Sequence, residues 1–366
     1  MAVRDPHLHV IVLAGGIGAR FWPASTPSVP KQLLPLGGDR PLIRETVDRA
    51  LRLVPPDRLA ILTGSHLRGP IARTLPPETG KSFLVEPRPR GTGPALAWAA
   101  WTLARQDPEA ILLSLHSDHV VSPEEEFLDS LRAACHIART EDSLVTLAVP
   151  PTRPETGYGY IRPGAVLEPG SPWDRFRAFR VRSFVEKPDV ERARRYLRDG
   201  FLWNSGIFAW TARRFLEEVR IHAPEVATHL PLLEAGDTDG FFRTVPPISV
   251  DEAVLERSGR VASVEATFQW DDVGTWEALR RTRTADGDGN VALGASYPVA
   301  AQNNTVFAPD ETVVLFGVEG LLVVRSGGIT LVASRERAGE LKELLKALPE
   351  ALRNPDGGHP HRNPEE

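Results

Sequence analysis

Short apolar runs of strand length recur along the chain, and helix-compatible segments such as Leu42–Leu53 separate several of them. The runs are His9–Leu13, Leu59–Thr63, Ser82–Val85, Ala110–His116 and Leu144–Val149. Apolar strands that alternate with helices are typical of a largely parallel sheet that is covered on both faces. We therefore predict a doubly wound α/β fold.

Two polar segments start where a predicted strand ends. The segment LAGGIGAR begins at Leu13, and the segment HSDH occupies residues 116–119. Glycine dominates the first segment, whereas the second carries an aspartate between polar neighbours. Ligands of such sheets bind beyond the carboxyl ends of the strands, so we expect both segments to lie at the functional edge of the sheet.

Changes in composition and in hydrophobic patterning along the sequence predict two folded parts and a tail. We predict one large domain at residues 1–285, because the polar, glycine-rich stretch TADGDGNVALG follows Arg283. Alternating runs such as TVVLFG and GLLVVR predict a small β-rich domain at 286–353. A closing helix is expected after Ser334, where helical spacing relates Ala338, Leu341, Leu344, Leu345 and Leu348. Residues 354–366 lack core-forming side chains and are predicted to be disordered.

Composition excludes several classes of protein. Of the 366 residues, 42% are hydrophobic and 25% charged, which is ordinary for a globular protein. The net charge of -5 leaves no basic footprint for nucleic acid or an anionic membrane. The single cysteine, Cys135, forms no internal disulfide, and neither a signal peptide nor an apolar stretch of roughly 20 residues is present. We expect a cytoplasmic protein.

The glycine cluster Gly15, Gly16 and Gly18 exposes backbone amides that phosphate oxygens can approach closely. It is no dinucleotide fingerprint, because Phe21 stands where the third glycine belongs, and no Walker A lysine follows. Arg20 and Lys31 add cations beyond it. The cluster by itself is a phosphate loop or an ordinary glycine-rich turn, and the two cations favour the former.

A second anion site is open to interpretation. Gly93 and Pro94 introduce ALAWAAWTLA, a segment that is apolar nearly all round and so predicts a buried helix. Its N-terminus, with Arg90 and Thr92 just upstream, offers amides and a positive dipole end to an anion. A core helix with a glycine entry loop explains the same residues.

Seven motifs occur in a fixed order over nearly the whole chain. They are LAGGIGARFWPASTPSVPKQLLPL, EPRPRGTGPAL, HSDH, GYGYI, FVEKP, WNSGIF and WDDVGTW, and the stretch GLLVVRSGGITLVASRERAGELKELL follows them. Together they resemble the signatures of sugar-1-phosphate nucleotidyltransferases, in particular the mannose-1-phosphate guanylyltransferases. The resemblance implies a Rossmann-like nucleotidyltransferase fold.

The resemblance also implies a reaction. An oxygen of mannose 1-phosphate attacks the α-phosphorus of GTP, giving GDP-mannose and pyrophosphate, with Mg²⁺ or another divalent cation as cofactor. The nucleophile is already an anionic phosphate, so catalysis can rest on positioning and electrostatic stabilisation. The sequence agrees, since it contains no zinc-site spacing, nucleophile elbow or catalytic triad.

Residue roles follow from the matching motifs. The resemblance implies nucleotide binding by Leu13, Ala14, Gly15, Gly16, Gly18, Arg20, Lys31, Glu86, Thr92 and Asp118. It implies sugar-phosphate binding by Gly159, Glu186, Lys187 and Asn204, with Arg20, Lys31 and Lys187 catalytic. Asn204 can donate and accept at once, as a sugar hydroxyl demands. Trp203 and Trp210 are expected to be core residues.

Asp118 and Asp272 are the metal ligands that the resemblance implies, because Mg²⁺ prefers oxygen donors. Asp271 is an adjacent rival. Neighbouring side chains on an extended segment point in opposite directions, so we expect only one of the two to face the metal.

Some residues depart from the family pattern. His116 and Ser117 stand where proline and alanine are commoner, and EPRPRGTGPAL has glycines where asparagine and alanine are usual. The second departure touches the loop expected near the base and leaves guanine selection open. For His116 we expect a hydrogen-bonded histidine at a strand end.

Alternative functions stay open on the sequence. They are a thymidylyl-, uridylyl- or adenylyltransferase acting on glucose 1-phosphate, a glycosyltransferase, and a non-catalytic relative that binds sugar nucleotides. A glycosyltransferase usually carries a D-x-D signature, which HSDH does not supply. We expect no phosphomannose isomerase activity. The apolar strands of the small domain can pair across the subunits of a homodimer.

Overall fold

The computed structural model describes residues 5–16, 18–79 and 83–353 of the chain. They form two compact units. Unit 1 comprises Met1–Gly15, Thr46–Ser117 and Val121–Trp270, and unit 2 comprises Gly16–Glu45, Asp118–Val120 and Asp271–Glu366. The predicted boundary at residue 285 stays a prediction, since these units are built from interleaved segments. The predicted disordered tail lies outside the described residues.

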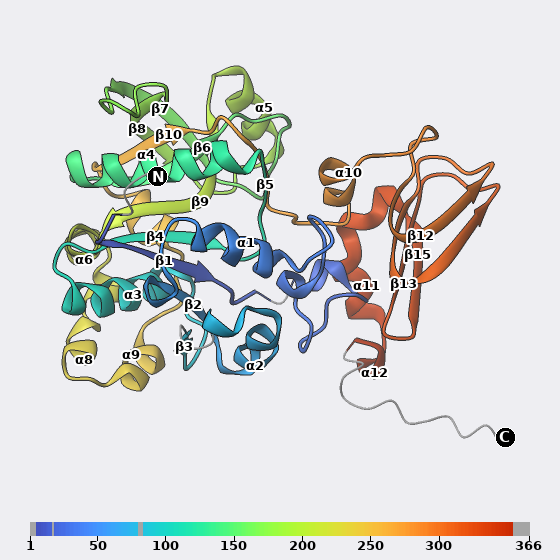
Figure 1. Cartoon of the computed structure of the whole chain (residues 1–366), viewed down its shortest axis with the longest axis horizontal. Helices are drawn as coiled ribbons and strands as arrows, with labels where there is room; N and C mark the ends of the chain where they lie inside the picture. Colours follow the sequence, from blue (N-terminus) through green and yellow to red (C-terminus); the bar gives the residue numbers. More distant parts are fainter. Residues whose placement is uncertain (1–4, 17, 80–82, 354–366) are drawn as a thin grey trace. The chain divides into compact units, whose positions relative to one another are not determined.

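A nine-stranded mixed sheet forms the centre of unit 1 (Figure 1). In spatial order its strands are β3 (Phe83–Glu86), β2 (Leu59–Gly64), β1 (Leu8–Leu13), β4 (Ile111–His116), β9 (Leu202–Thr211), β6 (Leu144–Val149), β10 (Val261–Glu265), β8 (Ala178–Val185) and β7 (Tyr160–Leu167). Strands β3, β2, β1 and β4 are parallel, as are β6 and β10, whereas β9 runs antiparallel to β4 and β6. The predicted α/β fold with a largely parallel sheet is confirmed. Ser82, the first residue of a predicted strand, lies outside the described residues.

Helices cover both faces of this sheet (Figure 1). In chain order they are α1 (Leu42–Leu51), α2 (Ser65–Thr74), α3 (Thr92–Gln106), α4 (Glu124–Thr140), α5 (Val190–Arg198), α6 (Ala212–His222), α7 (Pro224–Ala227), α8 (Leu230–Glu234) and α9 (Thr238–Thr244). Helices α3 and α6 pack together on one face, and α4 lies over β4, β6, β9 and β10 on the other. Helix α3 is buried along most of its length, as its apolar sequence predicts.

Two short strands flank predicted metal ligands. Strand β5 (Val120–Ser122) pairs with β11 (Gln269–Asp271) in a separate two-stranded sheet. Asp118 stands two residues before β5, and Asp272 directly follows β11. Two aspartates that are far apart in sequence therefore adjoin the ends of paired strands.

The C-terminal part of unit 2 is a four-stranded sheet with three short helices. The strands are β12 (Val291–Val299), β13 (Thr305–Phe316), β14 (Leu321–Ser326) and β15 (Ile329–Ser334), and the helices are α10 (Ala278–Thr282), α11 (Leu341–Ala347) and α12 (Glu350–Arg353). Gly327 and Gly328, both with positive φ, make the hairpin turn between β14 and β15. The predicted closing helix begins as a 3-10 turn over Arg335–Glu340, because Gly339 weakens helix formation there.

The core of unit 2 joins early and late parts of the chain. Phe21 packs edge-on against Trp276 at 4.9 Å between ring centroids, and Trp276 contacts Phe307 of β13 at 5.0 Å. Trp22, Leu34, Leu36, Leu322, Leu331 and Leu341 belong to the same core. The segment that follows the glycine cluster is therefore packed against the C-terminal sheet.

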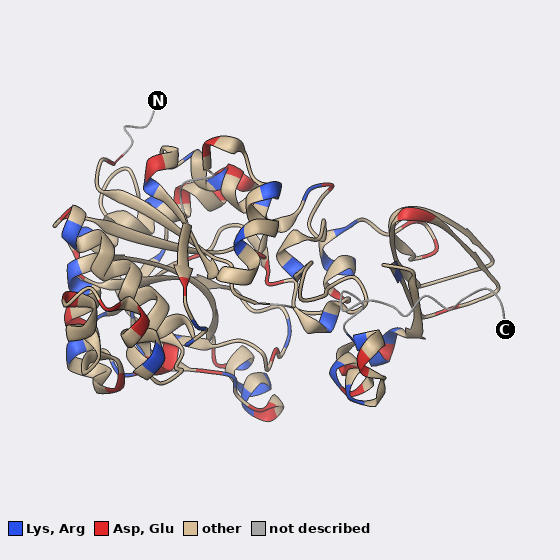
Figure 2. Ribbon diagram, turned by 90° about the horizontal axis from the view of Figure 1, so that it is seen from below, with Lys and Arg blue, Asp and Glu red and all other residues tan. Residues whose placement is uncertain are grey.

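Positive and negative residues are interspersed over the helices (Figure 2).

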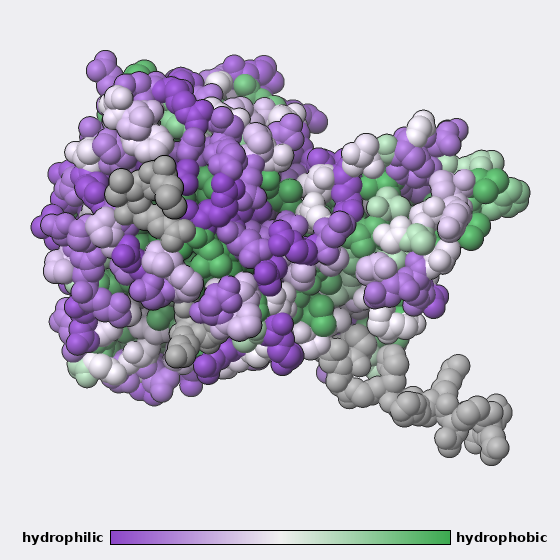
Figure 3. Space-filling model, viewed as in Figure 1, coloured by the Kyte–Doolittle hydropathy of each residue, from purple (hydrophilic) through white to green (hydrophobic). Residues whose placement is uncertain are grey.

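Strands β12 and β13 expose an apolar face. Tyr297 pairs with Val314 and Val299 with Phe316 across these strands, and all four side chains are exposed. Figure 3 shows hydrophobic residues gathered on these strands. The predicted pairing of these strands in a homodimer stays a prediction.

Among the described residues, no helix has both the length and the apolar character that crossing a membrane requires.

Candidate functional site

The N-terminal part of the glycine segment continues strand β1. Leu13 and Ala14 are buried, and their backbones are held in the sheet: the Ser117 amide donates to the Leu13 carbonyl, the Leu62 carbonyl accepts from the Ala14 amide, and the Thr63 hydroxyl donates to the Ala14 carbonyl. Gly15 and Gly16 follow and are exposed. The amides that can approach a phosphate are therefore those after Ala14.

Gly18 has a specific structural task. Its φ of 72° is in the left-handed region, and a Cβ built on it would lie 2.3 Å from Cβ of Lys31. A Cβ on Gly16 would meet nothing within 4 Å. Gly18 thus makes room for the stem of Lys31, whereas Gly16 leaves its space open. Arg20 is exposed on the 3-10 helix Ala19–Phe21, where its guanidinium is accessible to an anion.

Lys31 brings two predicted metal-binding residues together within unit 2. Its side chain is nearly buried, and Nζ lies 2.6 Å from Oδ2 of Asp118. The same ammonium donates to the backbone carbonyl of Asp272 at 2.7 Å. The Phe21 ring lies below it, 5.9 Å from Nζ to the centroid. Three residues from separate segments, Lys31, Asp118 and Asp272, thus form one polar group, which we call the Lys31 cluster.

The neighbouring aspartates differ in their surroundings. Asp271 is buried and forms a two-pronged ion pair with Arg281, with Nη2 of Arg281 donating to Oδ1 at 3.0 Å. It also accepts from the Val273 amide at 2.8 Å. Asp272 is half-buried and accepts from the Gly274 amide at 3.0 Å. Both carboxylate oxygens of Asp271 are committed to structure, which favours Asp272 as the metal ligand.

Glu86 ends strand β3 close to the glycine segment. It is nearly buried, and withdrawal from water raises the pKa of its carboxyl to about 7. A Cβ on Gly15 would lie 3.6 Å from Oε1 of Glu86. The structure therefore places this predicted nucleotide-binding residue beside the exposed glycine backbone of unit 1.

The glycines of EPRPRGTGPAL have a packing role. Gly91 has a φ of 81°, and a Cβ there would lie 2.5 Å from the Ile248 carbonyl oxygen. The Gly93 amide donates to that same oxygen at 3.1 Å, and the Thr92 hydroxyl accepts from the Val250 amide at 2.9 Å. Glycine at these two positions lets the loop lie directly against residues 248–250. The structure thus gives Thr92 an internal partner in addition to its predicted nucleotide role.

The four predicted sugar-phosphate residues lie together in unit 1. The Gly159 carbonyl accepts from the Asn204 amide at 2.8 Å, and a Cβ on Gly159 would lie 2.6 Å from Oε2 of Glu186. Lys187, which has a φ of 45°, donates to Oε1 of Glu186. Burial lowers the pKa of Lys187, but the hydrogen bond to Glu186 and the charges of Glu186, Asp251 and Glu252 together outweigh it and raise that pKa overall. We call Gly159, Glu186, Lys187 and Asn204 the sugar-phosphate cluster.

Two further residues contact this cluster and were missed by sequence reasoning. Thr146 of β6 donates to Oδ1 of Asn204 at 2.7 Å, and Asp251 accepts from Nδ2 at 2.9 Å. Thr146 lies within an apolar strand, and Asp251 begins the π-helix Asp251–Leu255. Neither belongs to a recognisable motif, so only the fold brings them to Asn204.

Two tryptophans near the site belong to the core, and His116 packs against a glycine of β9. Trp203 and Trp210 are buried, as predicted, and Trp210 stacks on Phe208 and Phe215. His116 lies against Gly206, where a Cβ would stand 2.8 Å from Nε2. Gly206 of WNSGIF therefore leaves room for the ring of His116.

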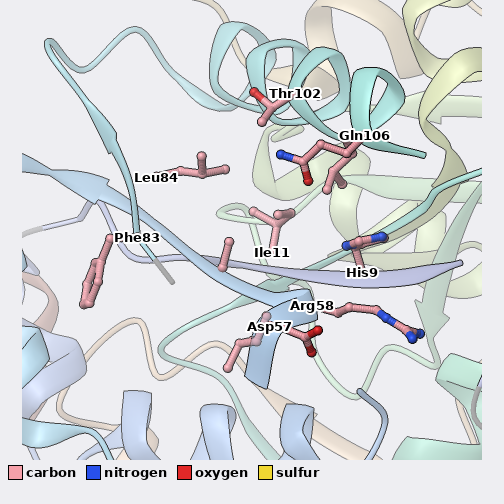
Figure 4. A pocket seen from close by; sticks show the side chains of 11 residues that line it. His9, Ile11, Asp57, Arg58, Phe83, Leu84, Thr102 and Gln106 are labelled. Atoms are coloured by element: carbon pink, nitrogen blue, oxygen red, sulfur yellow. The ribbon is translucent and has the colours of Figure 1, made fainter. Parts of the chain in front are cut away.

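A cavity of about 350 Å³ lies elsewhere in unit 1 (Figure 4). Its lining includes His9 and Ile11 of β1, Arg58 at the start of β2, and Thr102 and Gln106 near the end of α3. These residues surround the amino ends of β1 and β2, whereas Gly15 and Gly16 follow the carboxyl end of β1. The cavity contains none of the residues predicted from the sequence.

Replacing Gly18 with alanine tests the contact with Lys31. The left-handed backbone and the overlap with Cβ of Lys31 are expected to destabilise the fold by at least about 1–2 kcal/mol and to lower activity by displacing the ammonium. Gly16→Ala is the matched control, since its methyl meets no protein atom. Thermal unfolding and nucleotide KM separate the two: Gly16→Ala should keep the melting temperature and raise KM if phosphate approaches that backbone. An unchanged Gly18→Ala protein would remove this role.

Comparisons with known proteins agree with the motifs. A family model described as nucleotidyl transferase matches residues 9–288. The chain is 33% identical to a mannose-1-phosphate guanylyltransferase of Escherichia coli over 92% of this chain and 73% of that protein. It is 34% identical to mannose-1-phosphate guanylyltransferase ManC of Salmonella typhimurium, over 99% and 76% respectively. The crystal structure described as mannose-1-phosphate geranyltransferase from Thermus thermophilus has a TM-score of 0.84 and 34% identity, covering 93% of this chain and 99% of that one.

Proposed function

Since the chain belongs to the nucleotidyl transferase family, we propose that it transfers GMP from GTP to mannose 1-phosphate, giving GDP-mannose and pyrophosphate. The Lys31 cluster is the observation that carries the proposal. It places an ammonium and two aspartates together, as charge management on a triphosphate requires. The substrates follow from the relatives, which are named as mannose-1-phosphate guanylyltransferases.

Each substrate has its own residues in this proposal. In unit 2, Gly16 and Gly18 offer backbone amides to the triphosphate, and Arg20 and Lys31 neutralise its β- and γ-phosphates. In unit 1, Glu86 and Thr92 contact the rest of the nucleotide. In the sugar-phosphate cluster, Lys187 meets the phosphate, while Glu186 and Asn204 hydrogen-bond the sugar hydroxyls. Gly159 leaves room for the Glu186 carboxylate.

The chemical step is a displacement at phosphorus. An oxygen of mannose 1-phosphate forms a bond to the α-phosphorus of GTP, and the bond from that phosphorus to the bridging oxygen of the β-phosphate breaks. Pyrophosphate leaves with the electron pair. No proton has to be removed from the nucleophile, so the residues act by positioning and by holding charge.

The residues present fit a hard divalent cation such as Mg²⁺. Asp118 and Asp272 supply carboxylate oxygens, the donors that Mg²⁺ prefers. The carboxylate of Asp118 already binds one cation, the ammonium of Lys31. Asp118 and Asp272 would hold the ion, which would neutralise phosphate charge when bound.

We propose a cytoplasmic enzyme, because the one cysteine of the chain is buried and unpaired.

Pyrophosphate release tests the function directly. Purified protein with Mg²⁺ is incubated with mannose 1-phosphate or glucose 1-phosphate, each crossed with GTP, ATP, UTP and dTTP. Release confined mainly to mannose 1-phosphate with GTP is expected. Release with another pair would replace the substrates and keep the reaction, and binding of a sugar nucleotide without any release would contradict an enzyme and favour a regulatory relative.

A further inference from the structure

The carboxamide of Asn204 is held on three sides. Its Oδ1 accepts from the Thr146 hydroxyl at 2.7 Å and from the Gly206 amide at 3.3 Å. Its Nδ2 donates to Oδ1 of Asp251 at 2.9 Å. The Asn204 side chain is therefore fixed by groups from β6, β9 and the π-helix Asp251–Leu255.

These contacts define what Asn204 can offer to a ligand. A carboxamide oxygen has two lone pairs, and both are engaged by the described partners. The amide nitrogen has two hydrogens, of which one is engaged by Asp251. Within the described part of the chain, the second hydrogen is therefore the one that this nearly buried side chain can still donate to a ligand. This hydrogen makes Asn204 a potential donor to a ligand, and its dual role toward the sugar stays a prediction.

Asp251 and the Gly206 amide together set this orientation. If the amide were flipped, its oxygen would face the Asp251 carboxylate, and its nitrogen would meet the Gly206 amide, which is itself a donor. We propose that Asp251 is a positioning residue for the sugar phosphate: by accepting one hydrogen of Asn204, it fixes the carboxamide so that only a hydrogen-bond donor faces the ligand. The proposal rests on the proposed function, because it takes the sugar-phosphate cluster as the binding site.

The setting of Asp251 links this positioning to pH. The residue is half-buried, and withdrawal from water, with the nearby charge of Glu186, raises the pKa of its carboxyl to about 7. The charge of Lys187 acts in the opposite direction. Glu252, the next residue, carries a further carboxylate but accepts from the Ser249 hydroxyl at 2.9 Å. A protonated carboxyl still has an oxygen that accepts from Asn204, so the contact survives protonation.

The sign of the pH effect follows from charge. A sugar phosphate dianion beside Lys187 adds negative charge near Asp251 and favours its protonated form. Ligand binding should therefore take up a proton near pH 7. As pH rises above 7, the dianion meets a charged Asp251 carboxylate and binds more weakly, with an affinity that falls by at most about tenfold per pH unit.

Two substitutions separate the acceptor from the charge. Asp251→Asn keeps an oxygen for Asn204 and imitates the protonated carboxyl, whereas Asp251→Ala removes the acceptor. Glu252→Gln is the matched control, because it removes a neighbouring charge without touching Asn204. The experiment measures KM for mannose 1-phosphate and for GTP from pH 6 to 9. All variants share the titration of the sugar phosphate itself, so the ratio of wild type to variant isolates Asp251.

For Asp251→Ala, we expect KM for mannose 1-phosphate to rise about tenfold, as loss of one hydrogen bond implies, with KM for GTP unchanged. For Asp251→Asn, KM should equal the wild-type value at pH 6, and the ratio of wild-type to variant KM should grow above pH 7. Equal changes in the KM of both substrates in Asp251→Ala would overturn the positioning role, and a pH-independent ratio would contradict its link to pH. Should the alanine variant not fold, Asp251→Leu, which has a similar volume and also lacks an acceptor, decides the positioning role.

Binding measured by calorimetry keeps the two proposals distinguishable. Titration of mannose 1-phosphate in two buffers of different ionisation enthalpy counts the protons taken up, without turnover. Proton uptake by the wild type and its loss in Asp251→Asn assign the pH dependence to Asp251, and equal uptake by both proteins contradicts that assignment. Weaker binding of mannose 1-phosphate by Asp251→Ala supports the positioning role, and unchanged binding contradicts it. A wild-type protein that turns over none of the substrate pairs contradicts the proposed function instead, whatever the proton count.

Discussion

Lys31→Ala is expected to lower kcat/KM by at least about 100-fold, the loss typical when one charge-stabilising donor is removed from an active site. The ammonium contacts Asp118 and the Asp272 carbonyl, and we place it on the leaving phosphates. Without it, the charge that develops on pyrophosphate loses one of the two cations that we assign to it in unit 2. The loss should therefore appear in kcat as well as in the KM for GTP.

Stability must be measured beside activity, because Lys31 is nearly buried and its replacement removes the ion pair with Asp118. Lys31→Met keeps the aliphatic stem that passes Gly18 and is the better-packed variant. Lys342→Ala changes an exposed lysine of α11 and serves as the control. Normal turnover in a folded Lys31→Met protein would remove Lys31 from the catalytic residues.

Asp118→Asn should be more damaging still, with a loss in kcat of about 10²–10³-fold or more at ordinary Mg²⁺ concentrations. A neutral amide is a poor ligand for a hard cation, and it also gives up the ion pair with Lys31. We expect the Mg²⁺ concentration for half-maximal rate to rise strongly. Calorimetric titration with Mn²⁺ should show weakened metal binding without reference to turnover.

Asp271→Asn provides the contrast. Because Asp271 is bound by Arg281 and by the Val273 amide, its loss should lower the melting temperature and leave the metal titration unchanged. Asp272→Asn should behave like Asp118→Asn. The opposite pattern, with metal binding lost in Asp271→Asn and kept in Asp272→Asn, would exchange the assigned ligands.

The fold was readable from the sequence where a pattern is local. The apolar runs of β1, β2, β4 and β6 are strands, and the all-apolar segment after Gly93 is the buried helix α3. Antiparallel β9 was not predicted to lie between β4 and β6, because strand order depends on packing between distant segments. Sequence periodicity carries no information about such partners.

The candidate site shows the same division. Motifs predicted Lys31, Asp118 and Asp272 one by one. Only the folded chain shows that these residues contact one another and that Asp271 forms an ion pair with Arg281. Asp251 was missed because an aspartate at the start of a short helical segment is common. Its pKa and its contact with Asn204 come from tertiary burial.

The composition of unit 2 has a consequence for biosynthesis. Residues 16–45 leave the ribosome early, yet the core that supports them includes Phe307, Leu331 and Leu341. Phe21 and Trp22 therefore lack most of their packing partners until nearly the whole chain has been made. The loop that carries Lys31 should be among the last parts to become ordered during translation, so incomplete chains are exposed to proteases before they can become active.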